Sequence, residues 1–283
     1  MTASMTRWRL AATGSALLLG ASPAFAQEDP ALEDDGNSFS IGLGVGYVPS
    51  YEGSDDYRLI PAAVVRGEIN GHGFFTRGLQ LYFDLIPEPP GEKIDISFGP
   101  VVGARLNRTS SIKDARVRAL GELDTAIEVG AFAGIARTGI ITSDYDTLAF
   151  RVSYLKDVAG AHGSHIVSPS IEYGTPLSRF SYIGVGASAE FVGDGYASYY
   201  FDVTPAGSLA SGLRPFQADG GFKSWSVNLV GAQSLTGDLL GGLSLFAVGS
   251  YSRLQGDFRR SPIVADAGSP NQWFGAIGLA YSF

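Results

Sequence analysis

The sequence predicts an all-β fold, an antiparallel transmembrane β-barrel of about twelve strands, with ten strands as the alternative. Three observations carry this prediction. The chain opens with an export signal, its apolar residues alternate with small or polar ones, and it ends on an aromatic residue. No segment after the export signal approaches the roughly 20 continuous apolar residues of a membrane-spanning helix. The alternating segments span about ten residues each, the length that a tilted strand needs to cross a bilayer.

The N-terminus carries the export signal. Arg7 and Arg9 occur there without an acidic residue, an apolar run covers residues 10–20, and Ala24-Phe25-Ala26 has the small-x-small pattern of a cleavage site. Residues 1–26 are therefore predicted to be a cleaved signal peptide. Residues 27–37 are acidic and lack periodicity, so we expect a disordered lead. The barrel is expected to comprise residues 38–283.

The alternation sets the number of strands. Phe39, Ile41, Leu43, Val45 and Tyr47, for example, alternate with serine and glycine, and eight clear strands of this kind follow from residue 93 to the end. Three more lie within residues 39–48, 58–69 and 79–86. Eleven is odd, whereas bacterial single-chain barrels have even strand numbers. A short strand at residues 74–77 raises the expected number to twelve.

The last strand orients the barrel. Trp273, Ile277, Leu279, Tyr281 and Phe283 share one face, and small or polar residues occupy most of the other. This end resembles the C-terminal signal that the barrel-assembly machinery of Gram-negative envelopes reads, with Tyr281 and Phe283 as its aromatic positions. Because both termini of such barrels lie in the periplasm, the long connections should be extracellular. They comprise residues 49–56, 107–123, 192–220 and 255–270.

Charged residues fall on the small face of the strands, which we assign to the lumen. On the lipid face, Arg or Lys would cost about 2–4 kcal/mol at the bilayer midplane. Two interpretations remain open: the charges line a narrow pore, or they form ion pairs across a closed barrel, which is favoured. Inward side chains such as Phe132 and Phe246 would help to close it. The lumen candidates are Asp95, Arg105, Glu128, Arg151, Glu172 and Glu190.

Catalytic and cofactor sites find little support. His162, Ser164 and His165 would need a loop to act together, and no third oriented group has convincing spacing, so an exposed polar turn is favoured. Similarly, the acidic residues of segment 49–56 lack the spacing of a known calcium loop, and a solvated turn with a positive φ at Gly53 is favoured. We expect no enzyme activity, no cofactor and no metal.

Composition and clustering exclude other classes. The formal net charge of −8 argues against nucleic-acid binding, and the absence of cysteine excludes thiolate chemistry. An aromatic cluster at residues 196–201 is expected to be an interface belt or a strand extension.

Two blocks resemble the MipA/OmpV family of outer-membrane proteins. The stretch PSYEGSDDYRLIP at residues 49–61 matches one family motif, and residues 251–272 match the closing motif. The basic, aromatic run Phe258-Arg259-Arg260 departs from the family pattern and puts any family ligand contact at this loop in doubt. The motif loop comprises Tyr51, Gly53, Ser54, Asp55, Asp56 and Tyr57.

The resemblance implies a barrel in the cell outer membrane that contacts its lipid and lipopolysaccharide. In one family member it also implies a scaffold that joins a murein-degrading transglycosylase to a murein synthase. The predicted function is therefore a non-catalytic scaffold for peptidoglycan enzymes. The alternative is a narrow porin-like channel for small solutes, and a lipid-modifying enzyme is the third and weakest hypothesis.

Overall fold

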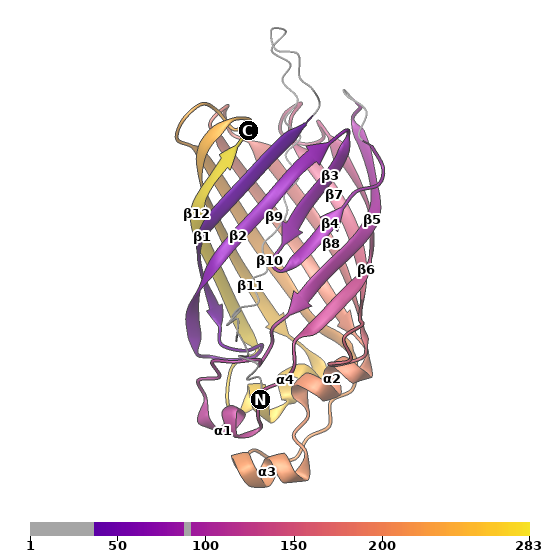
Figure 1. Cartoon of the computed structure of the whole chain (residues 1–283), viewed down its shortest axis with the longest axis vertical. Coiled ribbons are helices and arrows are strands. Elements are labelled where there is room, and N and C mark those ends of the chain that lie inside the picture. Colours follow the sequence, from indigo (N-terminus) through magenta and orange to yellow (C-terminus); the bar gives the residue numbers. More distant parts are fainter. Residues whose placement is uncertain (1–36, 88–91) are drawn as a thin grey trace, which may run out of the picture.

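Twelve antiparallel strands close into one barrel in the computed structural model, which describes residues 37–87 and 92–283 (Figure 1). The predicted fold class and strand number are confirmed. The predicted signal peptide and almost all of the lead lie outside the described residues. The strands are β1 (Ser38–Pro49), β2 (Tyr57–Ile69), β3 (His72–Arg77), β4 (Gln80–Phe83), β5 (Ile94–Arg105), β6 (Ala126–Thr138), β7 (Thr147–Asp157), β8 (His165–Pro176), β9 (Ser181–Val192), β10 (Gly221–Ser234), β11 (Gly242–Leu254) and β12 (Asn271–Ser282).

Each strand pairs with its neighbour in sequence, and β12 closes the barrel on β1. The closing register runs from Ser40↔Ser282 to Tyr47↔Gly275, and the N–H of Phe283 donates to the carbonyl of Phe39 at 2.9 Å. Closure leaves no free first or last edge, which is how a sheet can span a bilayer.

The two faces of the wall differ as the alternation predicts. On β1, Leu43 and Val45 are 66% and 54% exposed on the outer face, whereas Gly42 and Gly46 are buried inside. Aromatic pairs mark both ends of the outer face. Tyr47 stacks on Tyr57 at 4.9 Å near the long loops, and Phe39 lies 6.0 Å from Phe283 at the other end. Such aromatic girdles are typical of the two membrane interfaces.

The β3–β4 hairpin is short and leaves part of β2 unpaired on one side. β3 pairs only with residues 66–69 of β2. Thr76 Oγ1 then replaces a strand partner, accepting from the N–H of Val65 at 3.0 Å and donating to its carbonyl at 3.2 Å. Residues two or four apart in a strand point their backbone groups the same way, so the backbone nitrogen of Pro61 faces the same side as that of Val65. Pro61, which has no N–H, therefore lies on the unpaired edge. Proline at this position discourages the addition of another strand.

The long and short connections gather at opposite ends of the barrel. Five helices lie at the end away from the C-terminus, which we call the loop end, and the termini of the described barrel lie at the short-turn end (Figure 1). None of the helices in the described residues is long and apolar enough to cross a membrane. The helices are α1 (Ala115–Ala119), α2 (Asp194–Phe201), α3 (Pro205–Ser211), α4 (Gly256–Arg260) and α5 (Pro262–Ala265).

Candidate functional site in the lumen and loop plug

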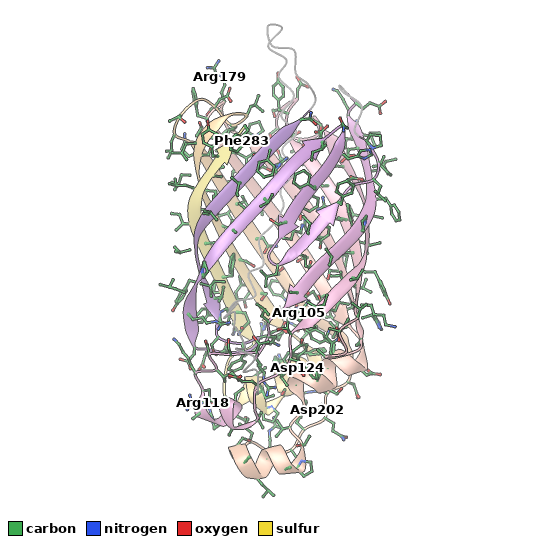
Figure 2. All side chains as sticks on the ribbon, viewed as in Figure 1. Arg105, Arg118, Asp124, Arg179, Asp202 and Phe283 are labelled. Atoms are coloured by element: carbon green, nitrogen blue, oxygen red, sulfur yellow. The ribbon has the colours of Figure 1, made fainter. Side chains whose placement is uncertain are left out.

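An ion pair with a histidine stands where the lumen meets the loop end. Arg105 Nε donates to Glu128 Oε1 at 2.6 Å, and Nη2 lies 3.3 Å from Oε2, a bidentate arrangement. His162 Nε2 lies 3.4 Å from the same Oε1, and Glu128 is only 1% exposed. Figure 2 labels Arg105 in the part of the barrel nearest to the helices. Because such a buried carboxylate needs compensation, Arg105 and Glu128 form one structural unit.

A second ion-paired group crosses the middle of the lumen. Glu172 on β8 pairs with Arg77 on β3 and lies 3.7 Å from Arg151 Nη1 on β7. The Arg151 guanidinium also stacks 4.9 Å from the centre of the Phe75 ring, and Phe132 meets Phe75 edge to face at 6.1 Å. Strands β3 and β8 are not neighbours in the barrel, so these side chains bridge its interior.

A third group joins the wall to the loops. Lys223 Nζ lies 2.5 Å from both Glu190 and Glu52, and Tyr196 OH donates to the other Glu52 oxygen at 2.7 Å. Lys223 is only 1% exposed although simple alternation from Trp225 would place it outside. A β-bulge between Phe222 and Ser224 turns it inward.

Asp95 is the lumen candidate that joins none of these groups. It is half-buried on β5, and no Lys, Arg or His nitrogen of the described residues lies within 4.0 Å of its carboxylate.

Apolar side chains fill the short-turn half of the lumen beside β1 and β12. Phe246 packs over Gly42 and Gly278, where an added Cβ would lie 3.0 Å and 2.6 Å from its ring. Ala62, Val248 and Ala276 complete this buried cluster. The small inner residues of these strands therefore make room for aromatic side chains.

The motif loop is built into the loop end. Tyr51 is 3% exposed and its hydroxyl donates to the carbonyl of Ala267 at 2.6 Å, while Ser54 is fully buried. Gly53 has a φ of +95°, as the sequence predicts. Burial raises the pKa of Tyr51 far above its ordinary value, with the nearby Asp114 carboxylate adding to the effect, so Tyr51 stays a neutral hydrogen-bond donor.

The two ends of the chain meet through Gln272. Its Oε1 accepts from the N–H of Gly53 at 3.1 Å, and its Nε2 donates to the carbonyls of Ser54 and Ser269 at 3.1 and 2.6 Å. Tyr57 OH likewise accepts from the N–H of Trp273 at 3.0 Å. The two blocks that carry the family resemblance are thus one packed unit. Asp55 and Asp56 lie at its exposed and half-buried surface.

An aromatic helix seals the same end. Tyr196 and Tyr200 of α2 are 0% and 1% exposed and pack against the His162 ring at 5.2 and 5.8 Å. The expected interface belt or strand extension at residues 196–201 is wrong, and so is the exposed turn at His162. The apolar side chains of these loops had no visible partner in the sequence, because they pack on one another. We call this packed unit, the motif loop with α2 and α4, the loop plug. Phe258, part of the departure from the family motif, packs edge to face on Phe201 at 5.1 Å.

Arg108 supports this helix from a neighbouring loop. It is 3% exposed, and its Nη1 donates to the carbonyl of Tyr200 at 3.1 Å. Burial lowers the pKa of Arg108 to about 10, which still leaves it protonated at neutral pH.

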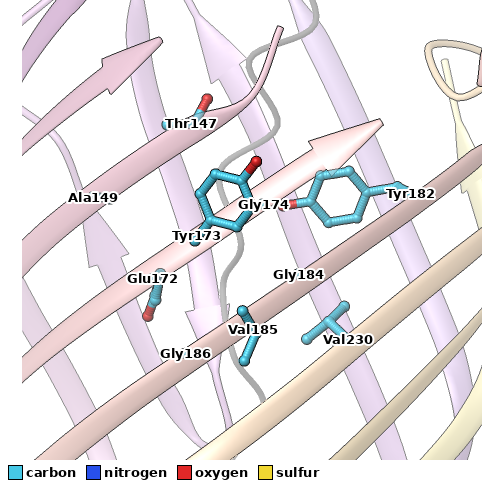
Figure 3. Close-up of a pocket in the computed structure, with 10 residues that line it drawn as sticks. All are labelled: Thr147, Ala149, Glu172, Tyr173, Gly174, Tyr182, Gly184, Val185, Gly186 and Val230. Atoms are coloured by element: carbon cyan, nitrogen blue, oxygen red, sulfur yellow. The ribbon is translucent and has the colours of Figure 1, made fainter. Parts of the chain in front are cut away.

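The described part of the barrel contains cavities, and two of them bear on its lumen. The larger, of about 220 Å³, lies between the loop plug and the middle of the lumen. The smaller, of about 20 Å³, has Tyr173 and Tyr182 in its lining and has room for about one water molecule (Figure 3). In the described part of the chain, no group of three His, Cys, Asp or Glu side chains is placed to hold a metal ion.

The predicted assembly signal lies on the outer face of the closing strand. Tyr281 and Phe283 are 45% and 72% exposed, and their rings lie 4.8 Å apart. Figure 2 places Phe283 at the short-turn end, where an external factor could reach it.

The sequence profile of the MipA family, described as MltA-interacting protein MipA, matches residues 41–283. The chain belongs to the MipA family. The match covers the whole barrel except the first residues of β1, and it includes both motif blocks. No curated protein sequence matches this chain significantly.

Solved outer-membrane proteins resemble the fold only loosely. The COG4313 outer membrane channel of Pseudomonas putida F1 is 12% identical, with a TM-score of 0.45, over 91% of this chain and all of that one. OmpT of Vibrio cholerae is 8% identical, with a TM-score of 0.34, over 89% of this chain and 99% of that one. The TodX monoaromatic hydrocarbon channel, as a deletion mutant, is 11% identical, with a TM-score of 0.37, over 95% and 97%. We draw no functional argument from these similarities.

Proposed function

We propose that this MipA-family barrel is a non-catalytic, non-conducting scaffold of the cell outer membrane that binds a murein transglycosylase of the MltA type at its periplasmic end. The partner class comes from the description of the family. Contact with lipopolysaccharide and the assembly machinery belongs to the same proposal.

The packing of the lumen carries the non-conducting part. Phe132 and Phe246 are 1% and 9% exposed, and the ion pair between Arg77 and Glu172 spans the interior. The α2 helix and the motif loop cover the loop end. A solute could pass only if the packed lumen side chains and the covering loops both moved aside. A scaffold, in contrast, gains rigidity from this packing.

The short turns supply a docking surface despite their length. Each of three turns presents a large apolar side chain: Ile141, Leu177 and Leu235 are 65%, 66% and 53% exposed. Exposed apolar side chains beyond the ends of the strands are suited to contact another protein. We call Ile141, Leu177 and Leu235 the turn rim. Because the termini and short turns of such barrels face the periplasm, the turn rim lies on the side of murein.

A capture experiment tests the scaffold role. The detergent-solubilised full chain should retain an MltA-type transglycosylase, and the triple variant Ile141→Asp, Leu177→Asp, Leu235→Asp should lose about tenfold or more of that capture. Leu209→Asp is the matched control, because Leu209 is 91% exposed on α3 at the opposite end. Equal capture by the triple variant and the wild type would refute docking at the turn rim. No capture by the wild type would refute this transglycosylase as the partner.

The larger cavity favours a second candidate function, a narrow channel for small solutes. It shows that the lumen is not filled along its whole length. Opening would require movement of the loop plug above it, and single-channel recording separates this candidate from the scaffold.

A further inference from the structure

Two kinds of polar side chain, serine hydroxyl groups and arginine guanidinium groups, line the larger cavity. Strands β7 to β11 contribute small polar side chains, such as Ser170, Ser188 and Ser226, with Ser188 Oγ and Ser226 Oγ only 2.7 Å apart. Arg58 of β2 lines the cavity from the opposite part of the wall, and Arg151 of β7 lies directly beside Ser170. A cavity lined by both guanidinium and hydroxyl groups is suited to an anion that also carries hydroxyl groups.

Both arginines hold buried donors without hydrogen-bond partners. Nε and Nη1 of Arg151 make no hydrogen bond within the described structure, and Arg151 is only 6% exposed. Its Nη1 has Glu172 nearby, but at 3.7 Å this is an ion pair rather than a hydrogen bond. Nε and Nη1 of Arg58 are likewise buried and unbonded. Buried donors are costly to leave unsatisfied, so the cavity is prepared for an acceptor.

The charge around the cavity sets the charge of the ligand. Counting the residues that line it and those ion-paired to them, five cations face four carboxylates. Among the cations, Arg58 has no carboxylate within 4.0 Å in the parts of the chain that the structure describes. Among the groups within this distance, one negative charge balances the site and a dianion would leave an excess, while Asp95 acts on Arg151 only from beyond 4.0 Å. The set is Arg58, Arg77, Arg105, Arg151 and Lys223 with Glu52, Glu128, Glu172 and Glu190.

We propose that the cavity binds a small hydroxyl-rich monocarboxylate, of the sugar-acid class, with its carboxylate on Arg58 and its hydroxyl groups on Arg151 and the serine side chains. Planar guanidinium groups bind carboxylates with paired hydrogen bonds. The volume of about 220 Å³ is below the roughly 300–1,000 Å³ of pockets for drug-sized molecules, so a ligand of monosaccharide size fits. The site is independent of the scaffold role, because the turn rim lies at the other end of the barrel.

Calorimetric titration of the full chain in detergent tests this site with three probes. D-glucuronate carries one carboxylate, D-glucose is its neutral counterpart, and glucose 6-phosphate tests a dianion. Glucuronate should bind about tenfold or more tighter than either of the others. Arg58→Gln should bring the affinity for glucuronate close to that for glucose. Arg58→Lys keeps the charge but not the paired donors of the guanidinium group, so it should retain part of the affinity for glucuronate. Arg179→Gln, in a turn at the opposite end (Figure 2), should change nothing.

Three results would overturn the proposal. Glucuronate binding no tighter than glucose would mean that Arg58 holds no anion, and full affinity in both Arg58→Gln and Arg151→Gln would mean that the anion binds elsewhere. Tighter binding of glucose 6-phosphate than of glucuronate would contradict the single-charge balance. Each variant is first checked for a folded barrel by the shift of its unheated band on a denaturing gel.

Discussion

Glu128 shows how single residues hold the lumen of this barrel together. It accepts hydrogen bonds from Arg105, with His162 against the same oxygen, in a site where it is 1% exposed. A charge in such a place is stable only with its partner, and the partner depends on it equally.

Replacing Glu128 should therefore be strongly destabilising. Glu128→Ala leaves Arg105 as an uncompensated buried charge, which costs about 3–5 kcal/mol of free energy of unfolding. Urea unfolding in detergent micelles measures this loss. Glu122→Ala, in an exposed part of the preceding loop, is the control and should stay within about 0.5 kcal/mol of wild type. A loss below about 1 kcal/mol for Glu128→Ala would contradict the buried pair.

Asp146 gives the short-turn end a predictable dependence on pH. Burial alone would raise the pKa of its carboxyl, but the N–H groups of Ile140 and Ile141, at 2.7 and 2.9 Å, and Tyr173 OH, at 2.9 Å, donate to it. These hydrogen bonds outweigh burial and hold the pKa well below its ordinary range. The ionised carboxylate therefore stabilises the fold above the unfolded pKa of about 3.9, and this contribution fades as pH falls through the lowered folded pKa.

Asp146→Asn should cost about 1–3 kcal/mol of free energy of unfolding at neutral pH. The difference from wild type should shrink as pH drops below about 4, because the carboxyl of the unfolded wild-type chain then binds a proton while that of the folded chain stays ionised until lower pH. Unfolding curves from pH 7 downward in about one-unit steps check this. Asp144→Asn, an exposed neighbour, serves as control. A gap between Asp146→Asn and wild type that stays constant into strong acid would show that the carboxylate is not what stabilises the turn.

At the residue scale, the sequence predicts which charged residues face the lumen more readily than it predicts their ion-pair partners. Alternation singles out Arg105 and Glu128, because both lie on the small face of clear strands. It misses Lys223, because Lys223 is itself the extra residue of a β-bulge in β10, which strict alternation cannot place. It also cannot pair Arg77 with Glu172, since that contact joins strands that are distant in sequence and not adjacent in the sheet.

At the scale of elements, the closing seam depends on two glycines in register. Gly44 faces Gly278 across β1 and β12. A Cβ at Gly44 would lie 2.2 Å from the carbonyl oxygen of Ile277, and one at Gly278 would lie 2.4 Å from that of Leu43. The strands approach so closely here that backbone would have to move to admit a side chain.

Gly44→Val should therefore weaken barrel closure, whereas Gly249→Val should not. Gly249 on β11 has nothing within 4 Å of its position for a Cβ. The expected cost at Gly44 is about 1–3 kcal/mol, as for overpacking a tight site. The midpoint temperature for loss of the folded band on unheated gels measures the effect. Equal midpoints for the two variants would contradict a tight seam.

The loop plug depends on Gln272 in the same way. Gln272→Ala removes the link between the motif loop and β12, so the loop end should open more often and become sensitive to protease in intact cells. We expect about a tenfold faster cleavage of the loops, corresponding to about 1.4 kcal/mol. Gln217→Ala, in an exposed segment between α3 and β10, is the control. Unchanged protection in Gln272→Ala would show that other contacts hold the motif loop.

The sequence predicts strands better than the plug for a physical reason. A strand that meets lipid on one face and lumen on the other shows its period directly in the residues. The loop helices are short and turn their apolar residues toward one another, so Tyr196 and Phe258 find partners that lie far away in the chain. Their burial depends on the assembled end of the barrel, which local patterns do not encode.

At the scale of the whole molecule, the lumen is filled by side chains and its loop end is covered by loops. Ion pairs and aromatic rings cross the lumen around Phe132, apolar side chains fill it around Phe246, and the motif loop with α2 covers the loop end. The cavity between the loop end and the middle of the lumen is about 220 Å³. The turn rim leaves the opposite end apolar and exposed, as the proposed scaffold requires.

Single-channel recording in a planar bilayer tests this closed state most directly. The purified protein, reconstituted alone, should show no steady conductance steps above the bare membrane, while an open porin in the same bilayer shows them. Stable, reproducible steps from the wild-type protein would contradict a packed lumen and would favour the channel instead.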